Sequence, residues 1–258
     1  MSETLIRFEK VTKRFGTRTV LDEVDLEIQR GETLFIVGSS GAGKSVSLRH
    51  MVRLLTPDSG RIWVGDDCVN EARGADLERI RARFGMLFQS AALLQWMNAG
   101  ENVALPLREH TDLSDDEIDA KAREKLDLVG LADAYEKLPS EVSGGMRKRV
   151  GLARAIVMDP EIILYDEPTS GLDPVTSRTI DQLIDDLRKR LGVTSVVVTH
   201  DLHSALTIGT RIAVLNQGQI LEVSTPQQFI QSKHPFVQGF LESQFITKRG
   251  PWEEHITP

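Results

Sequence analysis

Short apolar runs alternate with longer segments of helical period along most of the chain. The runs are too short for helices, which is typical of strands. Several early runs alternate apolar and polar positions, which predicts an antiparallel flap beside a main parallel sheet. This order of elements indicates an α/β fold. The predicted strands are Leu5 to Phe8, Val24 to Ile28, Leu34 to Val37, Arg61 to Val64, Phe84 to Phe88, Ile162 to Tyr165, Ser195 to Val198, Ile212 to Leu215 and Gln219 to Val223.

Helical signals concentrate in the middle of the chain. Ser114 and Glu117 have the spacing of a capping box, and apolar residues then recur at helical intervals, which predicts a surface helix over Asp115 to Val129. We expect a helical subdomain over about residues 97–158, because the first part of this stretch carries no strand signal. It lies within a predicted domain of residues 1–234. The remaining residues, 235–258, form a C-terminal extension that is expected to begin with a short docking helix reaching about Phe245.

The composition is that of an ordinary globular protein. Of the 258 residues, 40% are hydrophobic and 27% are charged, which excludes a disordered or fibrous chain. The net charge of -7 argues against non-specific binding to the phosphates of nucleic acids. The single cysteine, Cys68, allows no internal disulfide. No apolar run approaches the roughly twenty residues of a membrane span, and no secretory signal is visible, so we expect a cytoplasmic chain that meets a membrane through partners.

One glycine-rich segment carries phosphate-binding chemistry. Gly38-Ser-Ser-Gly-Ala-Gly-Lys-Ser45 fits G-x-x-x-x-G-K-[ST] and directly follows a predicted strand, the context that a phosphate loop requires. Its glycines let backbone amides close around phosphate oxygens, and the next helix adds its positive end. Lys44 is expected to neutralise the β- and γ-phosphates of ATP, and Ser45 to bind Mg²⁺. The expected nucleotide-binding residues here are Gly38, Ser39, Ser40, Gly41, Ala42, Gly43, Lys44, Ser45 and Val46.

Two acidic residues follow the predicted strand Ile162 to Tyr165. Successive side chains of a strand point to opposite sides, so Asp166 and Glu167 suit different tasks. Asp166 is expected to hold the magnesium shell, and Glu167 to face the attacking water as general base. Alone, the pair would be typical of an acidic solvated turn. Together with a phosphate loop, it indicates ATP hydrolysis.

A second glycine turn, Val142-Ser-Gly-Gly-Met146, precedes a stretch of helical period. It predicts a second anion-binding helix start, made by Ser143, Gly144 and Gly145. With its motifs in this order, the chain resembles the ABC ATPase family, whose signature is L-S-G-G-Q, from its start to about Val223. The resemblance implies a P-loop NTPase core with an antiparallel β flap and a helical signature subdomain.

The same resemblance assigns further site residues. Phe15 corresponds to the aromatic that stacks on adenine, Gln89 to the Q-loop glutamine and His200 to the switch histidine. Asp173 ends the D-loop sequence Ser170-Gly-Leu-Asp173 and is expected to meet the nucleotide. The resemblance thus implies an ATPase that uses ATP and Mg²⁺. It implies that the catalytic residues are Glu167, His200 and Gln89, and that the metal ligands are Ser45, Gln89 and Asp166.

Members of this family pair head to tail, so that the signature of one subunit completes the phosphate site of the other. The resemblance therefore implies a homodimer attached to integral membrane permease subunits, with lipid-binding and small accessory subunits as further partners and no nucleic acid. Leu87 to Leu94, Asn98 to Glu109 and the Ser-Gly-Gly-Met turn resemble the branch that energises phospholipid movement in Mla-type systems. This implies a position on the cytoplasmic side of the inner membrane.

Three consecutive basic residues, Arg147, Lys148 and Arg149, follow the second glycine turn. Such a run is typical of a solvated helix face. Positive potential near the nucleotide of the opposite subunit is the alternative interpretation.

ABC-type ATPases of DNA repair and chromosome organisation need a long coiled coil between the phosphate loop and the signature, and the interval from Ser45 to Ser143 contains no heptad run. A regulatory ATPase that signals at the membrane without moving cargo, as in cell division, remains open. The catalytic motifs do not separate it from a transporter subunit.

Overall fold

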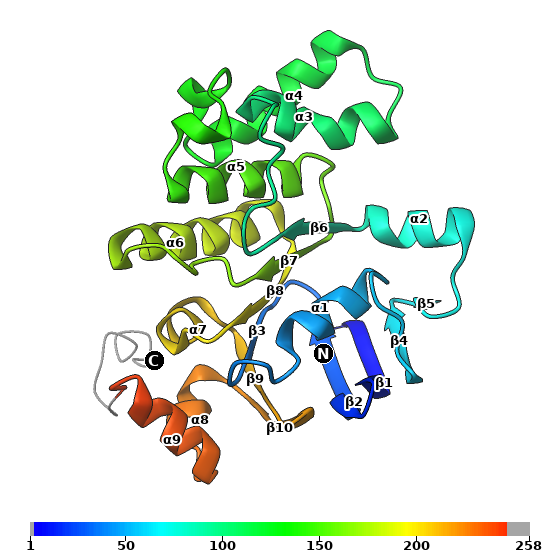
Figure 1. Cartoon of the computed structure of the whole chain (residues 1–258), viewed down its shortest axis with the longest axis vertical. Helices are drawn as coiled ribbons and strands as arrows, with labels where there is room; N and C mark the ends of the chain where they lie inside the picture. Colours follow the sequence, from blue (N-terminus) through cyan, green and yellow to red (C-terminus); the bar gives the residue numbers. More distant parts are fainter. Residues whose placement is uncertain (1–2, 247–258) are drawn as a thin grey trace. The chain divides into compact units, whose positions relative to one another are not determined.

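The computed structural model describes residues 3–246 of the chain. They form two compact units (Figure 1). The first unit combines residues 3–80 with residues 194–246, and the second consists of residues 81–193. The final part of the predicted C-terminal extension, residues 247–258, lies outside the described residues. Within the described range, no helix is long and apolar enough to cross a membrane.

Two sheets make up the first unit. The antiparallel sheet has the order β2-β1-β4-β5; in the other, β10, β9, β3 and β8 lie side by side, with β3 parallel to β8 and β9. The strands are β1 (Thr4–Phe15), β2 (Arg18–Gln29), β3 (Thr33–Val37), β4 (Ser59–Val64), β5 (Asp67–Cys68), β8 (Thr194–Thr199), β9 (Arg211–Asn216) and β10 (Gln219–Ser224). The helices are α1 (Lys44–Met51), α2 (Gly74–Ala82), which runs into the second unit, α7 (Leu202–Ile208), α8 (Pro226–Ile230) and α9 (Pro235–Ser243).

Burial along the strands explains the two sheets. Every residue of β3 and of β8 is buried, as expected for parallel strands covered on both faces. In β2, burial alternates from Val24 to Ile28, so one face of the antiparallel sheet packs on the core and the other meets solvent. The predicted parallel strands and antiparallel flap are confirmed.

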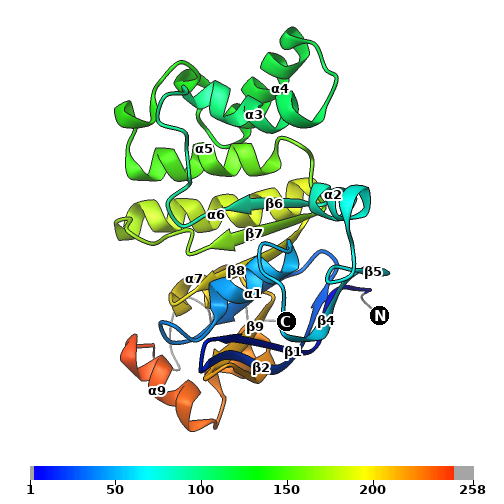
Figure 2. The same cartoon turned by 45° about the vertical axis from the view of Figure 1, so that its right-hand side comes forward.

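The second unit contains two parallel strands and a group of helices (Figure 2). Its elements are β6 (Phe84–Leu87), α3 (Ala99–His110), α4 (Asp115–Leu128), η1 (Ala132–Ala134), η2 (Pro139–Glu141), α5 (Gly144–Ile156), β7 (Ile162–Asp166) and α6 (Pro174–Leu191). The helices α3, α4 and α5 pack against one another. The backbone N–H of Ser114 donates to Glu117 at 2.8 Å, so the predicted capping box and its surface helix are confirmed.

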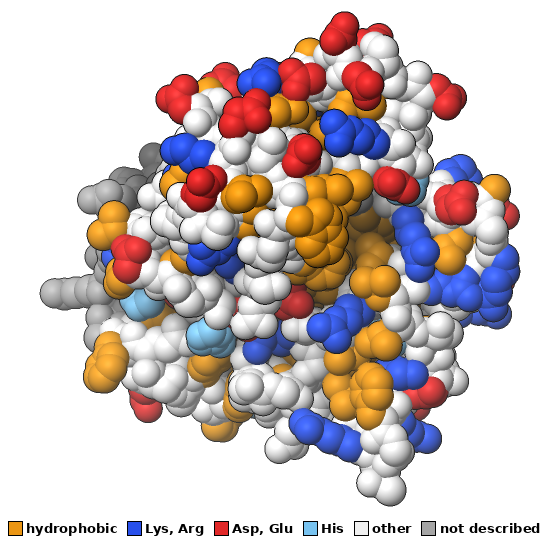
Figure 3. Space-filling model, turned by 45° about the horizontal axis from the view of Figure 1, so that its top comes forward, with side chains coloured by type: hydrophobic (Ala, Val, Ile, Leu, Met, Phe, Trp, Pro, Cys, Tyr) orange, Lys and Arg blue, Asp and Glu red, His pale blue; other side chains and the backbone are white. Residues whose placement is uncertain are grey.

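Acidic side chains gather over the helical part of the second unit, at the top of Figure 3. On and beside α4, the exposed acidic residues include Asp115, Asp116, Glu117, Glu124 and Asp127. This face therefore carries a negative potential.

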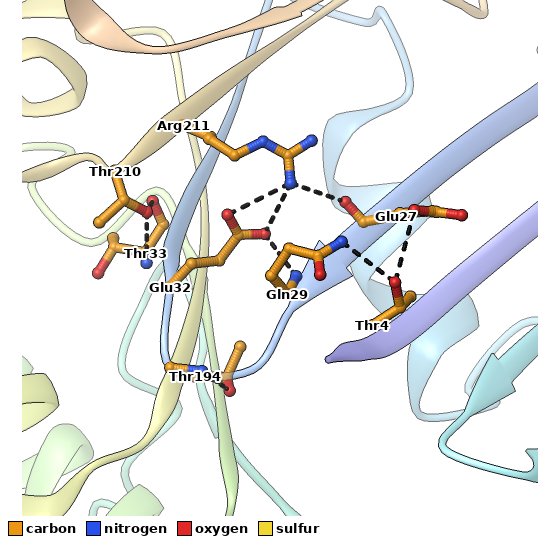
Figure 4. A network of polar contacts seen from close by, with 9 residues as sticks. Thr4, Glu27, Gln29, Glu32, Thr33, Thr194, Thr210 and Arg211 are labelled. Carbon is orange, nitrogen blue, oxygen red and sulfur yellow. Dashed lines mark hydrogen bonds and ion pairs between the residues drawn. The ribbon is translucent and has the colours of Figure 1, made fainter. Parts of the chain in front are cut away.

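An ion pair between a buried carboxylate and a partly exposed guanidinium joins β9 to the segment before β3 (Figure 4). Glu32 is 7% exposed, and its two carboxylate oxygens accept from Arg211 Nη1 at 3.2 and 3.4 Å. The same guanidinium nitrogen donates to the carbonyl oxygen of Glu27 at 3.3 Å, and the backbone N–H of Gln29 donates to Glu32 at 2.6 Å. One carboxylate thus connects the end of β2 with the start of β9.

Threonine hydroxyls continue this network at the amino ends of the parallel strands (Figure 4). Thr210 Oγ1 accepts from the backbone N–H of Thr33 at 3.0 Å and donates to the carbonyl oxygen of Thr33 at 2.9 Å. Thr194 Oγ1 accepts from the backbone N–H of Gly31 at 2.9 Å. These contacts fix the amino ends of β3, β8 and β9, whereas the predicted site residues follow the carboxyl ends.

We expect Glu32→Gln to lower the free energy of unfolding by about 1 kcal/mol at pH 5, because two polar contacts are weakened. Burial raises the pKa of the Glu32 carboxyl above its ordinary value of 4.5 despite the contacts with Gln29 and Arg211. A raised folded-state pKa means that the stability contributed by this group is complete below pH 4.5 and falls as pH rises through the folded-state pKa.

The difference in unfolding free energy between the unmodified protein and Glu32→Gln should therefore shrink as pH rises above 4.5. Urea unfolding of both proteins at a series of pH values measures this difference. A difference that grows with pH contradicts the account.

Candidate nucleotide site

The phosphate loop joins β3 to α1 in the first unit (Figure 1). Gly43 caps α1 with a left-handed backbone, at φ 108°. Lys44 is 7% exposed, and its Nζ donates to the carbonyl oxygens of Gly38 at 2.8 Å and Ser39 at 3.2 Å. The loop thus folds around an ammonium group at the positive end of a helix, where phosphate is favoured.

Two glycines of the loop are required by close packing. A Cβ atom at Gly38 would lie 2.0 Å from the carbonyl oxygen of Leu215, and one at Gly43 would lie 2.8 Å from that of Val20. Any other residue at either position would push the loop away from β9 or from β2. The spacing of the motif is therefore set by the neighbouring strands as well as by the phosphate.

Strand register brings the phosphate loop and His200 to one edge of the sheet. Val37, the last residue of β3, pairs with Thr199, the last residue of β8. Because these strands are parallel, Gly38 and His200 both begin the connections at their carboxyl ends. His200 is exposed, and Asp201 beside it caps α7 by accepting from two backbone N–H groups. This edge is where ligands bind in open α/β sheets.

Phe15 ends β1 in the same unit and is 47% exposed. Lys13 Nζ lies 5.4 Å from the centre of its ring, in cation–π geometry. Next along the hairpin, Arg18 Nη2 donates to the carbonyl oxygen of Gly41 in the phosphate loop at 3.1 Å. The sequence motifs did not single out Arg18, because nothing in its local spacing marks a contact with the loop.

In the second unit, register gathers the other predicted chemical groups. Leu87 of β6 pairs with Tyr165 of β7, so Gln89 and the acidic pair follow the carboxyl ends of neighbouring parallel strands. Asp166 is 5% exposed. Glu167 has φ 48°, a left-handed conformation that is uncommon for a residue other than glycine. The turn after β7 therefore redirects the chain at Glu167, and strain of this kind often marks functional sites.

Lys148 connects Gln89 and Glu167. Its side chain is buried, and its Nζ donates to the backbone carbonyl oxygens of both residues, with a distance of 3.1 Å to that of Glu167. Burial lowers the pKa of Lys148, while Asp166 and Glu167 favour its charged form. Gln89 Nε2 also donates to Ser170 Oγ at 3.4 Å. A single cation thus ties the Q-loop segment to the turn after β7.

The expectation of a solvated basic face is wrong for Lys148. It shares a helical face with buried Gly145 and Leu152, and this spacing could have revealed its burial from the sequence. The neighbouring cations also bind backbone carbonyl oxygens: Arg147 those of Pro139 and Val142, and Arg149 those of Val129 and Gly130.

The second glycine turn forms a helix start, as predicted. Ser143 is the N-cap of α5, and its Oγ accepts from the backbone N–H of Met146 at 3.2 Å. A Cβ atom at Gly145 would lie 2.4 Å from Thr176 Cγ2, so the absence of a side chain permits close packing on α6. Ser143 itself is exposed.

Asp173 is the N-cap of α6. Its carboxylate accepts from the backbone N–H groups of Val175 and Thr176, both at 3.0 Å, and from the Thr176 hydroxyl at 2.5 Å. These bonds, chiefly those from Thr176, lower the pKa of Asp173. The carboxylate predicted to meet the nucleotide is therefore engaged in capping a helix here, and its contact with nucleotide remains a prediction.

The family model for ABC transporters matches residues 21–170 of this chain. A probable ribonucleotide transport ATP-binding protein, mkl, from Mycobacterium leprae is 41% identical and covers 96% of this chain and 72% of its own length. The methionine import ATP-binding protein MetN from Streptococcus pneumoniae is 39% identical, over 94% of this chain and 71% of MetN. The intermembrane phospholipid transport system ATP-binding protein MlaF from Haemophilus influenzae is 36% identical, over 95% of this chain and 92% of MlaF.

A solved structure extends the comparison. The ATP-binding cassette MJ0796, in a dimeric post-hydrolysis state bound to ADP and Pi, superposes with a TM-score of 0.79 and is 34% identical. The match covers 86% of this chain and 99% of that one. The predicted ABC ATPase fold, with its antiparallel β flap, is confirmed. On the strength of the family match over most of its length, this chain belongs to the ABC transporter family, as a subunit that hydrolyses ATP.

Proposed function

We propose that this chain drives phospholipid movement through separate membrane subunits. The observation that carries the proposal is the similarity to MlaF, which extends over 95% of this chain at 36% identity. The Ser-Gly-Gly-Met turn and the Q-loop sequence support it, since both resemble the Mla-type branch. The relatives named for ribonucleotide and methionine transport make those two cargoes the competing possibilities.

In the proposed assembly, two copies of the chain bind two ATP molecules, and the Ser143 turn of each copy meets the γ-phosphate held by the other. The dimeric state of the MJ0796 cassette supports this arrangement. Lys44 would leave its loop carbonyls to bind the phosphates, and exposed Phe15 would stack on adenine. Phe15 is 47% exposed, which leaves its ring open to a base, whereas Lys44 is 7% exposed, inside the loop that would hold the phosphates.

Glu167 would accept the proton of the water that attacks the γ-phosphorus, while His200 and Gln89 would hold the reacting groups in line. A Mg²⁺ ion would lie against Ser45, Gln89 and Asp166, whose hydroxyl, amide and carboxylate oxygens are ligands of the kind it prefers. Once bound, it would neutralise charge that develops on the β- and γ-phosphates. ATP binding would close the dimer and hydrolysis would open it. The chain would then lie on the cytoplasmic side of the inner membrane, held by permease subunits.

The test is purification of the tagged chain with its partners in mild detergent, followed by reconstitution in lipid vesicles. We expect membrane permease and lipid-binding subunits to co-purify, and labelled phospholipid to move only with Mg-ATP. A matched complex that carries Lys44→Ala serves as the inactive control. If ATP drove the movement of methionine or a ribonucleotide but not of phospholipid, the proposal that phospholipid is the cargo would be wrong. Co-purification with cell-division proteins and no transport would favour a regulatory ATPase instead.

A further inference from the structure

The C-terminal helix α9 leads to a glutamine that binds the backbone on both sides of Asp201. Gln244 Nε2 donates to the carbonyl oxygen of His200 at 2.5 Å, and Gln244 Oε1 accepts from the backbone N–H of Leu202 at 2.9 Å. A carbonyl can only accept and a backbone N–H can only donate, so the two partners fix which way the amide points. All of these residues belong to the first unit.

The bond to Leu202 meets a specific need of α7. Leu202 is the first residue of this helix, and first-turn N–H groups have no acceptor within a helix. Asp201 accepts from the next two N–H groups, those of His203 at 2.9 Å and Ser204 at 3.4 Å. Gln244 supplies the acceptor for Leu202, so the helix start after His200 is completed from the C-terminal segment.

Gln244 is itself held in place from both sides. It is the C-cap of α9, and its backbone N–H donates to the carbonyl oxygen of Leu241 at 3.2 Å. Val237 and Leu241 before it and Ile246 after it are buried, at 0%, 7% and 7% exposure. Burial of these three apolar side chains anchors the segment. The amide is therefore presented from a fixed support, and its two hydrogen bonds join the end of α9 to the backbone on both sides of Asp201.

We infer that Gln244 is a positioning residue that holds His200 in its working orientation and so couples the C-terminal helix to ATP hydrolysis. The inference rests on the proposed role of His200 at the γ-phosphate. In the proposed function, ATP binds through Phe15 and the phosphate loop, whereas the Gln244 side chain binds the backbone of His200 and Leu202. Loss of the glutamine should therefore slow turnover while leaving ATP affinity nearly unchanged.

The experiment uses the assembled complex with the full chain and compares Gln244→Ala with Gln238→Ala. Gln238 is a matched control, since it lies on the same helix and donates to the carbonyl oxygen of Ser232. We expect kcat of Gln244→Ala to fall about tenfold, because small misplacements of a reacting group are costly. The Kd for ATP should stay within about twofold of the unmodified value, and Gln238→Ala should match the unmodified complex in both.

Two further measurements separate positioning from a loss of stability. In a His200→Gln background, adding Gln244→Ala should cause no further loss of turnover, because the two residues act through one interaction. In the chain labelled with ¹³C at histidine Cε1, the His200 signal, assigned from His200→Gln, should shift in Gln244→Ala, while the signals of His50 on α1 and His110 on α3 stay in place.

An unchanged His200 signal, or full additivity of the two substitutions, would overturn the inference. A general loss of folding would move all histidine signals and would overturn it as well. If the His200 signal shifts but His200→Gln hydrolyses ATP at the unmodified rate, Gln244 does position His200. The proposed role of His200, and with it the coupling to hydrolysis, then fails.

Discussion

Glu167→Gln should abolish ATP turnover and leave ATP binding intact. The substitution keeps the size of the side chain at the left-handed turn after β7 but removes the carboxylate that would accept the proton of water. General bases contribute about 10² to 10⁴ in rate, and we expect a loss of at least this size in the assembled complex. Phosphate release measures turnover, and a fluorescent ATP analogue measures binding.

The same substitution should make the closed dimer accumulate. If hydrolysis is what opens the dimer, a chain that binds ATP without hydrolysing it remains closed. Light scattering of the Glu167→Gln chain, without its membrane partners and at micromolar concentration, should show a dimer with Mg-ATP and a monomer without it. Glu109→Gln, an exposed position on α3 of the same unit, is the control and should hydrolyse ATP normally. A Glu167→Gln complex that turns over ATP at the unmodified rate would exclude Glu167 as the base.

Lys44→Ala should remove both tight Mg-ATP binding and turnover. The Lys44 ammonium group donates to the loop carbonyl oxygens of Gly38 and Ser39, and it would bind phosphate once ATP arrives. A charge-assisted hydrogen bond contributes about 1.5–3 kcal/mol, which predicts a loss of affinity of roughly 10- to 100-fold. Titration with a fluorescent ATP analogue measures this loss.

The fold should survive Lys44→Ala, because β3 and the buried apolar side chains of α1 remain. The melting temperature without nucleotide should stay close to the unmodified value. Arg49→Ala, at an exposed position on the same helix, is the matched control and should bind ATP normally. ATP affinity in Lys44→Ala equal to that of the control would contradict the phosphate-loop assignment.

The sequence predicted those strands, helix starts and loops whose residues lie close together along the chain. The apolar runs Leu34 to Val37 within β3 and Val196 to Val198 within β8 indicate strands buried on both faces, and the Ser114 capping box indicates the start of α4. The phosphate loop combines a strand, glycines and a helix start within a few residues. Each of these signals is complete within one short window of sequence.

Contacts between distant residues could not be predicted in this way. Glu32 and Arg211 are 179 positions apart, and Gln244 lies 44 positions after His200. Periodicity reports which face of an element is buried and does not report its partner. Lys148 combines the two cases: its helical spacing with Gly145 and Leu152 indicates burial, whereas its two carbonyl partners, 59 and 19 positions away, leave no signal in the sequence around it.

In the proposed mechanism, two copies of the chain share two ATP sites, each completed by Ser143 of the other copy. Ser143→Arg and Lys44→Ala chains carrying different tags can be assembled into one complex and isolated by both tags in turn. If sites are shared, this mixed dimer has one site with both lesions and one with neither. Its ATPase rate should then be well above that of either homodimer.

If each chain instead builds its own site, both sites of the mixed dimer carry a lesion. The measurement is therefore the ATPase rate of the doubly purified complex beside those of the two homodimers, with the unmodified complex as reference. We expect partial activity in the mixed dimer and almost none in either homodimer. Background activity in the mixed dimer, or unmodified activity in the Ser143→Arg homodimer, would contradict it.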